Sequence, residues 1–532
     1  RNSLQPCPAA TVPAFTAMFS VRALSMLLVV LFVAVVDASR PYPLSSPSQL
    51  RNAVSKTGPN SLRLKGGHYG QDTVHEILIK DIWSTDASPN PPSEITVKTM
   101  HVDHLTHWLP DLQRWPNPCK HKGAWVGEDE SVIDVIYVNS PRALRKGLIS
   151  RQWMRAGPKE KIYFDPTKVN AAIVTCGGLC PGLNNVIQSI TFSLRNRYNV
   201  ANVWGIQFGY KGFYSLDWME LTEESTRHIH TRGGTILGSS RGGHDLEKIM
   251  TALEEKGVNQ VYVIGGDGTH MGANIISKEA ARRKVPMSVC GVPKTIDNDV
   301  AFIDKSFGFD TAVGEAVKVI NCALIEADDS HEGVGIVKLM GRECGFIAMY
   351  ATLASNVVDI CLIPEEPFEL EELFQYAQEV IKKKGHCLIV VAEGAGQKHF
   401  EGLDLGKDPS GNKILPDIGT LLKNKCKDWF KAKGRPTEVR YIDPSYQIRS
   451  VPASPSDSVY CSALGTSVVH GAMAGLTGFS CGHRNNRYVY IPIDDMCDPS
   501  QKVRVDTSSR IYNRMVGHTG QPRFFSQLFR GI

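Results

Sequence analysis

The sequence predicts an α/β fold in which mostly parallel sheets are covered by helices on both faces, as in doubly wound domains. From Val169 onward, short apolar runs alternate with stretches of helical spacing, an order typical of parallel sheets. The chain has 532 residues, more than one hydrophobic core usually supports. We therefore expect two or more domains, with ligands bound at the carboxyl ends of the strands.

Residues 1–165 are expected to form a leader and an extension before the main fold. The stretches 40–60 and 84–96 are rich in Pro, Ser, Thr and Asn, which is typical of linkers. The apolar run Ala23–Val36 is too short to span a bilayer comfortably and has the pattern of a signal-peptide core. A plastid transit peptide should be richer in Ser and Arg. We predict no membrane partner and a cytoplasmic location, with the plastid as the alternative.

The main fold is expected to repeat the order strand, loop, helix. Each helix can then return the chain so that the next strand lies parallel to the last one. The strands are expected at Val169–Cys176, Val261–Ile264, Pro286–Val292, Val334–Leu339 and Leu388–Ala392, and the helices at Leu183–Arg195, His270–Arg283, Phe309–Asp328 and Glu343–Ala354.

Charge and cysteine content narrow the class of protein. The formal net charge is +5 without a long basic run, so no nucleic-acid partner is predicted. The 13 cysteines are scattered and form no paired C-x-x-C sets, which favours reduced thiols over a zinc site or a disulfide framework. Cys176 and Cys180 flank a glycine-rich loop, where they could form a redox switch or be two semi-buried thiols.

The first polar loop, Gly177–Gly182, separates a predicted strand from a predicted helix. Its glycines permit close backbone approach to a phosphate, and the following helix would point its N-terminus at the anion. Such turns are also common where no ligand binds.

The second polar loop reads Gly-Gly-Asp-Gly-Thr at 265–269. Its backbone N–H groups can surround a polyphosphate, and Asp267 supplies a carboxylate of the kind that Mg²⁺ takes beside substrate phosphates. The structural alternative is an Asp or Thr that caps the helix.

The third polar loop, Pro293–Asp299, carries two carboxylates in alternation. One of Asp297 and Asp299 can accept the proton of an acceptor hydroxyl, while the other supports the metal region. Thr295 can hydrogen-bond the acceptor, and Lys294 can neutralise charge. Together the three loops predict phosphoryl transfer.

Cationic residues for phosphate recognition occur in further short motifs. Arginine forks match phosphate oxygens, although a surface ion pair is the commoner role of any single arginine. Glu393 ends a predicted strand and could accept sugar hydroxyls. The candidate arginines are Arg241, Arg342, Arg440 and Arg449.

These motifs together resemble the phosphofructokinase family, over roughly residues 165–500, and most closely its plant-type, ATP-dependent subgroup. The carrying motifs are G-G-L-C-P-G-L-N at 177–184, G-G-T-I-L-G-S-S-R-G at 233–242, G-G-D-G-T at 265–269, P-K-T-I-D-N-D at 293–299, G-F-D-T-A at 308–312, M-G-R at 340–342, A-E-G at 392–394 and Y-I-D-P-S-Y at 441–446.

The resemblance implies phosphorylation of D-fructose 6-phosphate to fructose 1,6-bisphosphate by ATP with Mg²⁺, the committing step of glycolysis, in an allosteric enzyme. Asp297 and Arg342 would be catalytic, Asp267 would hold Mg²⁺, and Tyr210 would lie near the adenine. ATP would be bound by Gly177, Arg241, Gly242, Gly266, Asp267, Gly268 and Thr269. Fructose 6-phosphate would be bound by Thr295, Ile296, Asp297, Met340, Gly341, Arg342, Glu393, Tyr446 and Arg449, with Arg440 reaching it from a neighbouring subunit.

Donor choice is the open question within the family. Members that use pyrophosphate carry Asp where Gly268 stands and Lys where Lys294 stands, so the two positions disagree. The extra carboxylate would crowd the α-phosphate of ATP, and Gly268 therefore favours ATP. The alternatives are a pyrophosphate-dependent enzyme and a non-catalytic regulatory subunit. Gly-Gly-Asp-Gly-Thr also occurs in NAD kinases and lipid kinases, which lack the third loop and Met-Gly-Arg.

The resemblance further implies two Rossmann-like domains and a homo-oligomer, expected to be a tetramer. The nucleotide domain would comprise 166–309 and about 452–500, because the chain crosses back to it. The sugar domain would comprise 310–451, and 501–532 would be a C-terminal tail.

Overall fold

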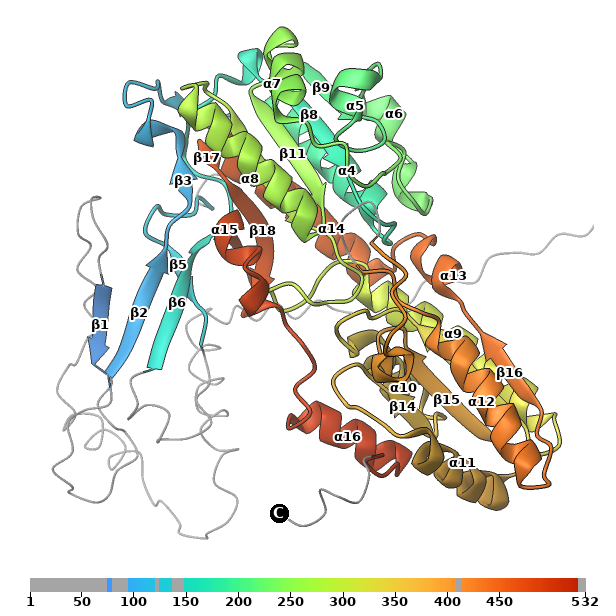
Figure 1. Ribbon diagram of the computed structural model, residues 1–532. Helices are drawn as coiled ribbons and strands as arrows, with labels where there is room; N and C mark the ends of the chain where they lie inside the picture. Colours follow the sequence, from blue (N-terminus) through green and yellow to red (C-terminus); the bar gives the residue numbers. More distant parts are fainter. Residues whose placement is uncertain (1–73, 79–93, 120–123, 136–147, 408–412, 525–532) are drawn as a thin grey trace, which may run out of the picture. The chain divides into compact units, whose positions relative to one another are not determined.

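A computed structural model describes residues 74–78, 94–119, 124–135, 148–407 and 413–524 (Figure 1). The predicted leader with its run Ala23–Val36, the linker 40–60 and the second linker up to residue 93 lie outside these residues. Within the described ranges, no helix combines the length and apolar character needed to cross a membrane.

The larger sheet has eleven strands, and its centre is parallel. Five neighbouring strands, β18, β12, β11, β8 and β9, run parallel to one another, while antiparallel pairs are added toward both edges. The order is β1 (Val74–Leu78), β2 (Glu94–Met100), β6 (Leu148–Arg155), β19 (Arg487–Pro492), β18 (Phe479–Arg484), β12 (Ser288–Pro293), β11 (Gln260–Gly265), β8 (Asn170–Thr175), β9 (Asn202–Ile206) and β10 (Met219–Glu220), with β5 (Ser131–Ile133) beside β6.

Helices cover both faces of the parallel centre. Alternate residues of each strand enter different apolar clusters: in β11, Tyr262 packs in one cluster and Val261 in the other. The first cluster includes α4 (Leu183–Phe192) and α14 (Pro455–Met473), and the second includes α7 (Leu246–Glu255) and α8 (Asp267–Arg282). A sheet buried on both faces accounts for the continuous apolar runs in the sequence.

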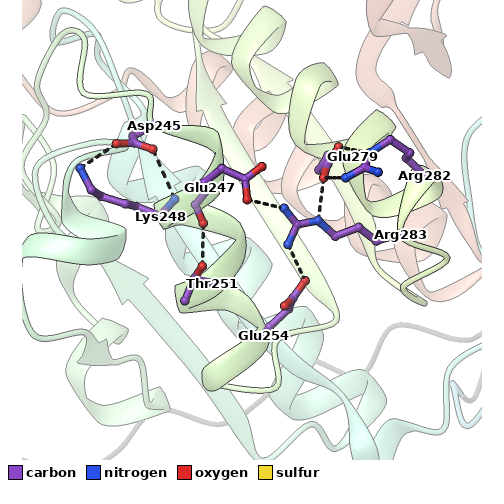
Figure 2. Close-up of polar contacts among 8 residues, drawn as sticks. All are labelled: Asp245, Glu247, Lys248, Thr251, Glu254, Glu279, Arg282 and Arg283. Carbon is purple, nitrogen blue, oxygen red and sulfur yellow. Dashed lines mark hydrogen bonds and ion pairs between the residues drawn. The ribbon is translucent and has the colours of Figure 1, made fainter.

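The C-terminal end of α8 is tied to α7 by one arginine, as Figure 2 shows. The guanidinium of Arg283 lies 2.7 Å from Glu247 and 3.1 Å from Glu254, both on α7, and 2.6 Å from Glu279 on α8. Asp245 caps α7 by accepting the backbone N–H of Lys248 at 3.3 Å. Arg283 therefore joins α7 to the end of α8 that lies opposite Asp267.

The smaller sheet has four strands, all parallel, in the order β14 (Ile360–Leu362), β15 (Cys387–Ala392), β13 (Val334–Leu339) and β16 (Val439–Ile442). Its two faces again enter separate clusters. One includes α9 (Phe309–Asp328) and α10 (Phe346–Ser355), and the other includes α11 (Leu370–Lys384) and α12 (Ile418–Ala432). The predicted α/β class with mostly parallel sheets is confirmed.

Segments outside the two predicted domains also contribute to the fold. Strands β2 and β6 of the predicted extension continue the larger sheet next to β19, and α16 (Arg510–Thr519) of the predicted tail packs in the cluster that contains α10. The domain boundaries themselves stay a prediction. The remaining strands and α-helices are β3 (Asp103–His104), β4 (Trp115–Pro116), β7 (Lys161–Ile162), β17 (Leu476–Thr477), α5 (Gly212–Ser215), α6 (Glu223–Thr226), α13 (Ser445–Arg449) and α15 (Ile493–Met496).

The strand predictions agree with the structure to within two residues, whereas two helix starts were wrong. Helix α8 begins at Asp267 and not at His270, because the N–H groups of Thr269 and His270 already bond to the carbonyl of Gly266 at 3.0 Å. Helix α10 begins at Phe346 and not at Glu343, since the N–H of Gly345 donates to the carboxylate of Glu365 at 3.1 Å. Helix α4 ends at Phe192, where a π-helical turn, Ser193–Arg197, follows.

Candidate active site

The three polar loops predicted from the sequence lie side by side, because β8, β11 and β12 are neighbours in the parallel centre of the larger sheet. Hydrogen bonds join them directly. The N–H of Lys294 donates to the carbonyl of Gly265 at 2.8 Å, and the ammonium of Lys294 donates to the carbonyl of Gly178 at 2.7 Å. The residues predicted to bind the donor are therefore brought together at one edge of the sheet.

The first loop is held by the segment that carries Arg241. The N–H of Gly177 donates to the carbonyl of Ser240 at 2.9 Å, and the hydroxyl of Ser239 donates to the carbonyl of Gly177 at 2.6 Å. Gly177 has φ +87°, and a Cβ there would lie 3.0 Å from the ammonium of Lys294. The positive φ therefore favours glycine at 177, and a side chain there would also press against the ammonium of Lys294. Gly242, with φ +74°, follows in the neighbouring segment.

The second loop turns directly into helix α8. Gly266 is the N-cap, so Asp267, Gly268 and Thr269 form the first turn, whose N–H groups face the helix end and favour anions. A Cβ at Gly268 would meet no described atom within 4 Å. Glycine at this helical position is therefore not demanded by the fold.

Two buried aromatic side chains bond to backbone carbonyl groups of the second loop. The hydroxyl of Tyr210 donates to the carbonyl of Thr269 at 2.6 Å, and Tyr210 is only 4% exposed. His270 is buried with one ring nitrogen 3.2 Å from the carbonyl of Gly266 and the other 3.1 Å from the hydroxyl of Ser480. Burial lowers the pKa of His270, which favours a neutral ring that supports the loop.

The third loop is shaped by its own side chains. The hydroxyl of Thr295 donates to Asp299 at 2.8 Å and accepts the N–H of Asp297 at 3.2 Å. Asn298 adopts φ +64°, and its side-chain oxygen accepts the N–H of Ser306 at 2.7 Å. Ile296 packs against the core clusters of both sheets. The loop is therefore pre-organised, which catalytic groups require.

Asp297 has the properties of a general base. Burial raises the pKa of its carboxyl group to about 7, helped by the negative charges of Asp299 and Glu393 and opposed by the N–H and guanidinium of Arg342. The pKa of Asp299 is also raised, first by burial. A base is most effective when its pKa lies near the working pH, so Asp297 is poised for proton transfer near neutrality.

Residues at the ends of strands in the smaller sheet, which were predicted to bind the sugar phosphate, lie near Asp297. Gly341 has φ +133°, and a Cβ on Gly394 would lie 1.9 Å from the carbonyl of Arg342, so neither position accommodates a side chain. The N–H of Glu393 donates to Leu339 at 2.9 Å, and burial raises the pKa of the Glu393 carboxyl group. Met340 is buried in the cluster that contains α9. The thiol of Cys344 donates to the carbonyl of Asp297 at 3.2 Å.

The remaining predicted residues lie on α13 and β16. Arg449 lies over the ring of the exposed Tyr446, at 4.7 Å from its centroid. In the part of the chain that the structure describes, the buried Nε atom of Arg449 has no hydrogen-bond partner. Arg440 lies on the edge strand β16, 2.6 Å from Glu438 and 3.8 Å from Glu326, and no described contact joins it to the other site residues.

The sequence analysis missed Lys502, which lies in the predicted tail. Its ammonium lies 3.3 Å from Asp267, 3.6 Å from Glu343 and 4.0 Å from Asp299. Burial acts to lower the pKa of Lys502, but the three carboxylates outweigh it and raise the pKa. A lysine without a surrounding motif carries no local signal, so no sequence pattern would have placed it here.

The acidic residues fit a divalent cation. Asp267, whose side chain is 38% exposed, and Asp299 both lie within 4.0 Å of the single ammonium of Lys502, so two carboxylates already face one cationic position. Mg²⁺ is usually held by one or two carboxylates together with substrate phosphates and water. Asp267 is the more accessible of the two and stays the predicted ligand.

The cysteines near the first loop are structural thiols. Burial raises the pKa of both Cys176 and Cys180 to about 12, so almost no thiolate exists at neutral pH. Every cysteine in the described residues is a free thiol. These properties favour the alternative of semi-buried thiols over a redox switch.

Comparisons with known proteins agree with the geometry. The sequence profile described as "Phosphofructokinase" matches residues 170–472. The chain is 47% identical over 439 residues to ATP-dependent 6-phosphofructokinase 7 of Arabidopsis thaliana, covering 80% of this chain and 88% of that protein. It is equally similar, at 47% over 439 residues, to the chloroplastic enzyme 4 of the same plant, covering 80% and 82%.

Solved structures show the same fold at low sequence identity. The pyrophosphate-dependent phosphofructokinase of Marinobacter aquaeolei superimposes with a TM-score of 0.56 at 20% identity, covering 67% of this chain and 93% of that one. The family profile spans more than half of the chain, and the similar plant enzymes extend over most of it. On these grounds, the chain belongs to the phosphofructokinase family.

Proposed function

We propose that the chain transfers the γ-phosphoryl group of ATP to the 1-hydroxyl of D-fructose 6-phosphate, giving fructose 1,6-bisphosphate and ADP. The observation that carries the proposal is Asp297, a carboxylate with a pKa of about 7 beside a glycine-lined helix start suited to phosphates. The similarity to enzymes named ATP-dependent 6-phosphofructokinase supports it. Through this reaction the enzyme would commit sugar phosphate to glycolysis.

In the proposed mechanism, the 1-hydroxyl attacks the γ-phosphorus in line as its proton passes to the carboxylate of Asp297. Thr295 and Ile296 shape the position of the acceptor, and the guanidinium of Arg342 offsets charge on the transferring group. Mg²⁺, held by Asp267, would supply neutralisation of the donor phosphates. The bond between the γ-phosphorus and the bridging oxygen of ATP breaks as the new P–O bond forms, so ADP leaves and the sugar oxygen carries the phosphoryl group in place of its proton.

The sugar phosphate is proposed to bind between the smaller sheet and α13. Glu393 ends β15 and can accept sugar hydroxyls, while Met340 and Gly341 line the approach. Arg449 supports recognition of the 6-phosphate, because its buried Nε atom lacks a partner among the described residues and unpaired buried donors are costly. Tyr446 stacks on Arg449.

For the donor, Gly268 supports ATP. Its missing side chain leaves open space at the start of α8, where no structural need for glycine exists. Lys294, the residue typical of pyrophosphate-using relatives, turns its ammonium to the carbonyl of Gly178 and is only 7% exposed. Its role is therefore compatible with either donor, and the steric argument at Gly268 favours ATP.

A paired donor assay tests the proposal directly. The purified chain should phosphorylate fructose 6-phosphate with ATP at equal Mg²⁺, and activity with pyrophosphate alone would overturn the donor assignment. Absence of activity with either donor would favour the regulatory-subunit alternative.

The Gly268→Asp variant sharpens this assay. ATP-dependent kcat/KM should fall by ~100-fold, because placing like charges together costs several kcal/mol. Gly314→Asp is the matched control, since Gly314 is another helical glycine whose Cβ would meet no described atom within 4 Å. Equal activity of the two variants would remove Gly268 from donor selection.

We further propose a homotetramer in which Arg440 reaches the 6-phosphate of a neighbouring subunit. Its position on an edge strand, with half of its side chain exposed, supports this role. Light scattering of the purified protein tests the assembly.

The cytoplasm is the proposed compartment and the plastid its alternative, since the similar plant proteins include one named as chloroplastic. A fluorescent fusion of the full chain distinguishes the two.

A further inference from the structure

The segment that follows the last strand of the larger sheet crosses the active site in a defined register. After β19, the chain passes through a short 3₁₀ helix, Pro499–Gln501. The N–H of Val503 then donates to the carbonyl of Asp299 at 3.1 Å, and the N–H of Val505 donates to the carboxylate of Glu365 at 2.7 Å. Val505 is buried in the core of the smaller sheet. Lys502 is therefore placed at the acidic loops by backbone bonds and burial of its neighbours.

The charges around Lys502 come from three separate loops. Asp267 follows β11, Asp299 follows β12 and Glu343 follows β13, and all three carboxylates lie within 4.0 Å of one ammonium. Arg504, two residues on, contacts Glu343 alone at 3.8 Å. The side chain of Lys502 is 34% exposed, and ion pairs that water still reaches contribute little to stability. Stabilisation of the fold therefore does not explain why one lysine contacts the carboxylates proposed for the reaction.

We propose that Lys502 is a further ligand of the phosphoryl donor and binds its β- and γ-phosphates; the inference rests on the proposed function. When Mg²⁺ and ATP bind at Asp267, the ammonium loses this carboxylate as its partner. Mg²⁺ held by Asp267 would be shared with the donor phosphates, which would bring these phosphates near the ammonium of Lys502. Glu343 retains Lys502 and directs it at the phosphates, where a lysine acts as a compact positive charge.

The alternative is that Lys502 acts only as a stand-in for Mg²⁺. In that role its ammonium neutralises the carboxylates of the metal-free site, and Mg²⁺ displaces it without any further contribution to nucleotide binding. The two roles predict opposite results when the ammonium is removed. A stand-in competes with Mg²⁺, so its loss should lower the Mg²⁺ requirement. A phosphate ligand adds binding energy, so its loss should weaken nucleotide binding that depends on the β- and γ-phosphates.

The test measures binding by calorimetry without turnover. In Lys502→Met, the dissociation constant for the Mg²⁺ complex of the non-hydrolysable β,γ-imido analogue of ATP should rise about tenfold. Binding of AMP and of fructose 6-phosphate should not change, which also shows that the variant is folded. Arg504→Met is the matched control for the loss of one positive charge from the same segment, and Lys502→Arg should keep most of the affinity.

Unchanged or tighter binding of the analogue in Lys502→Met, with a lower Mg²⁺ requirement, would overturn the proposal and leave the stand-in role. An equal loss of affinity for the analogue in Arg504→Met would also overturn it, because the effect would then follow from the net charge of the segment and not from the position of Lys502. The proposed function fails separately: it fails if the unmodified chain shows no ATP-dependent activity, whatever Lys502→Met binds.

Discussion

Two acidic loops on neighbouring strands use the same side chain for different tasks. Asp267 follows β11 and opens helix α8, where its carboxylate is partly exposed and faces the ammonium of Lys502. Asp297 follows β12 in a loop without a helix, and burial with nearby negative charge raises its pKa to about 7. The difference supports the proposal that environment, and not residue type, suits one carboxylate to a cation and the other to a proton.

The sharpest test of this contrast is Asp297→Ser. Removing the base should lower kcat by about 10²- to 10⁴-fold while the affinity for fructose 6-phosphate survives, because general base catalysis acts in the transition state. Steady-state kinetics and calorimetric sugar binding measure both quantities. Asp217→Ser, at an exposed aspartate, is the control. Unchanged turnover in Asp297→Ser would exclude Asp297 from proton transfer.

Asp267→Asn should give a different signature. The Mg²⁺ concentration for half-maximal activity should rise at least about 10- to 100-fold, because loss of a residue that only supports a metal ligand already has that effect. At saturating Mg²⁺, much of kcat should return, unlike in Asp297→Ser. Mg²⁺ titrations of both variants make the comparison. If both lose kcat without a change in Mg²⁺ dependence, the division of tasks between the loops is wrong.

The pH dependence should come from Asp297. Its carboxylate must be deprotonated to act, so kcat/KM should rise about tenfold per pH unit below pH 7 and level off above it. The affinity for fructose 6-phosphate, measured at each pH, separates the effect of ionising the substrate phosphate from the effect of ionising Asp297. A flat profile from pH 5.5 to 8.5 would contradict the assigned base.

The raised pKa of Asp297 also predicts that stability falls with rising pH, whereas activity rises. Since the folded pKa is about 7 and the unfolded value 3.8, the folded state holds its proton more tightly. The contribution to stability is therefore full below about pH 4 and lost as the pH rises through 7. Asp297→Asn should gain at most about 2 kcal/mol over the unmodified protein between pH 4 and 8, allowing for solvent screening. Denaturant titrations at the two pH values measure this gain, and an equal difference at both would contradict it.

Lys294→Met should have the smallest effect. The variant removes the ammonium that donates to the carbonyl of Gly178, so the first loop should loosen and the KM for ATP should rise about fivefold with little change in kcat. Lys318→Met, at an exposed lysine of α9, is the control. A fall of kcat by orders of magnitude would instead place Lys294 at the reacting phosphates.

Much of the site could be predicted because its residues lie in short contiguous motifs. Gly265–Thr269 and Pro293–Asp299 each follow a buried strand, and parallel neighbours bring the ends of such strands to one edge. The first turn of α8 was predicted as part of the loop. Gly265, Gly266 and Gly268 lie around the helix start, and glycine is a poor helix former, so the sequence does not show where the helix begins.

Long-range placements could not be predicted. Strands β2 and β6 pair in parallel and continue the larger sheet through β19, which follows more than 300 residues after β6, and local patterns carry no information on such partners. Lys502 reaches the acidic loops only because Val503 and Val505 form bonds with residues far back in the chain.

Local sequence therefore determined which groups the enzyme has available: glycines that permit phosphate approach, and the carboxylates of Asp267 and Asp297, for which we propose a cation and a proton as partners. The tertiary structure determined the acid–base properties of these groups. The pKa of Asp297 depends on burial, on Asp299 in its own loop and on Glu393 from the other sheet. Electrostatic energies depend on distance and surrounding solvent, and both are properties of the packed chain, not of any one segment.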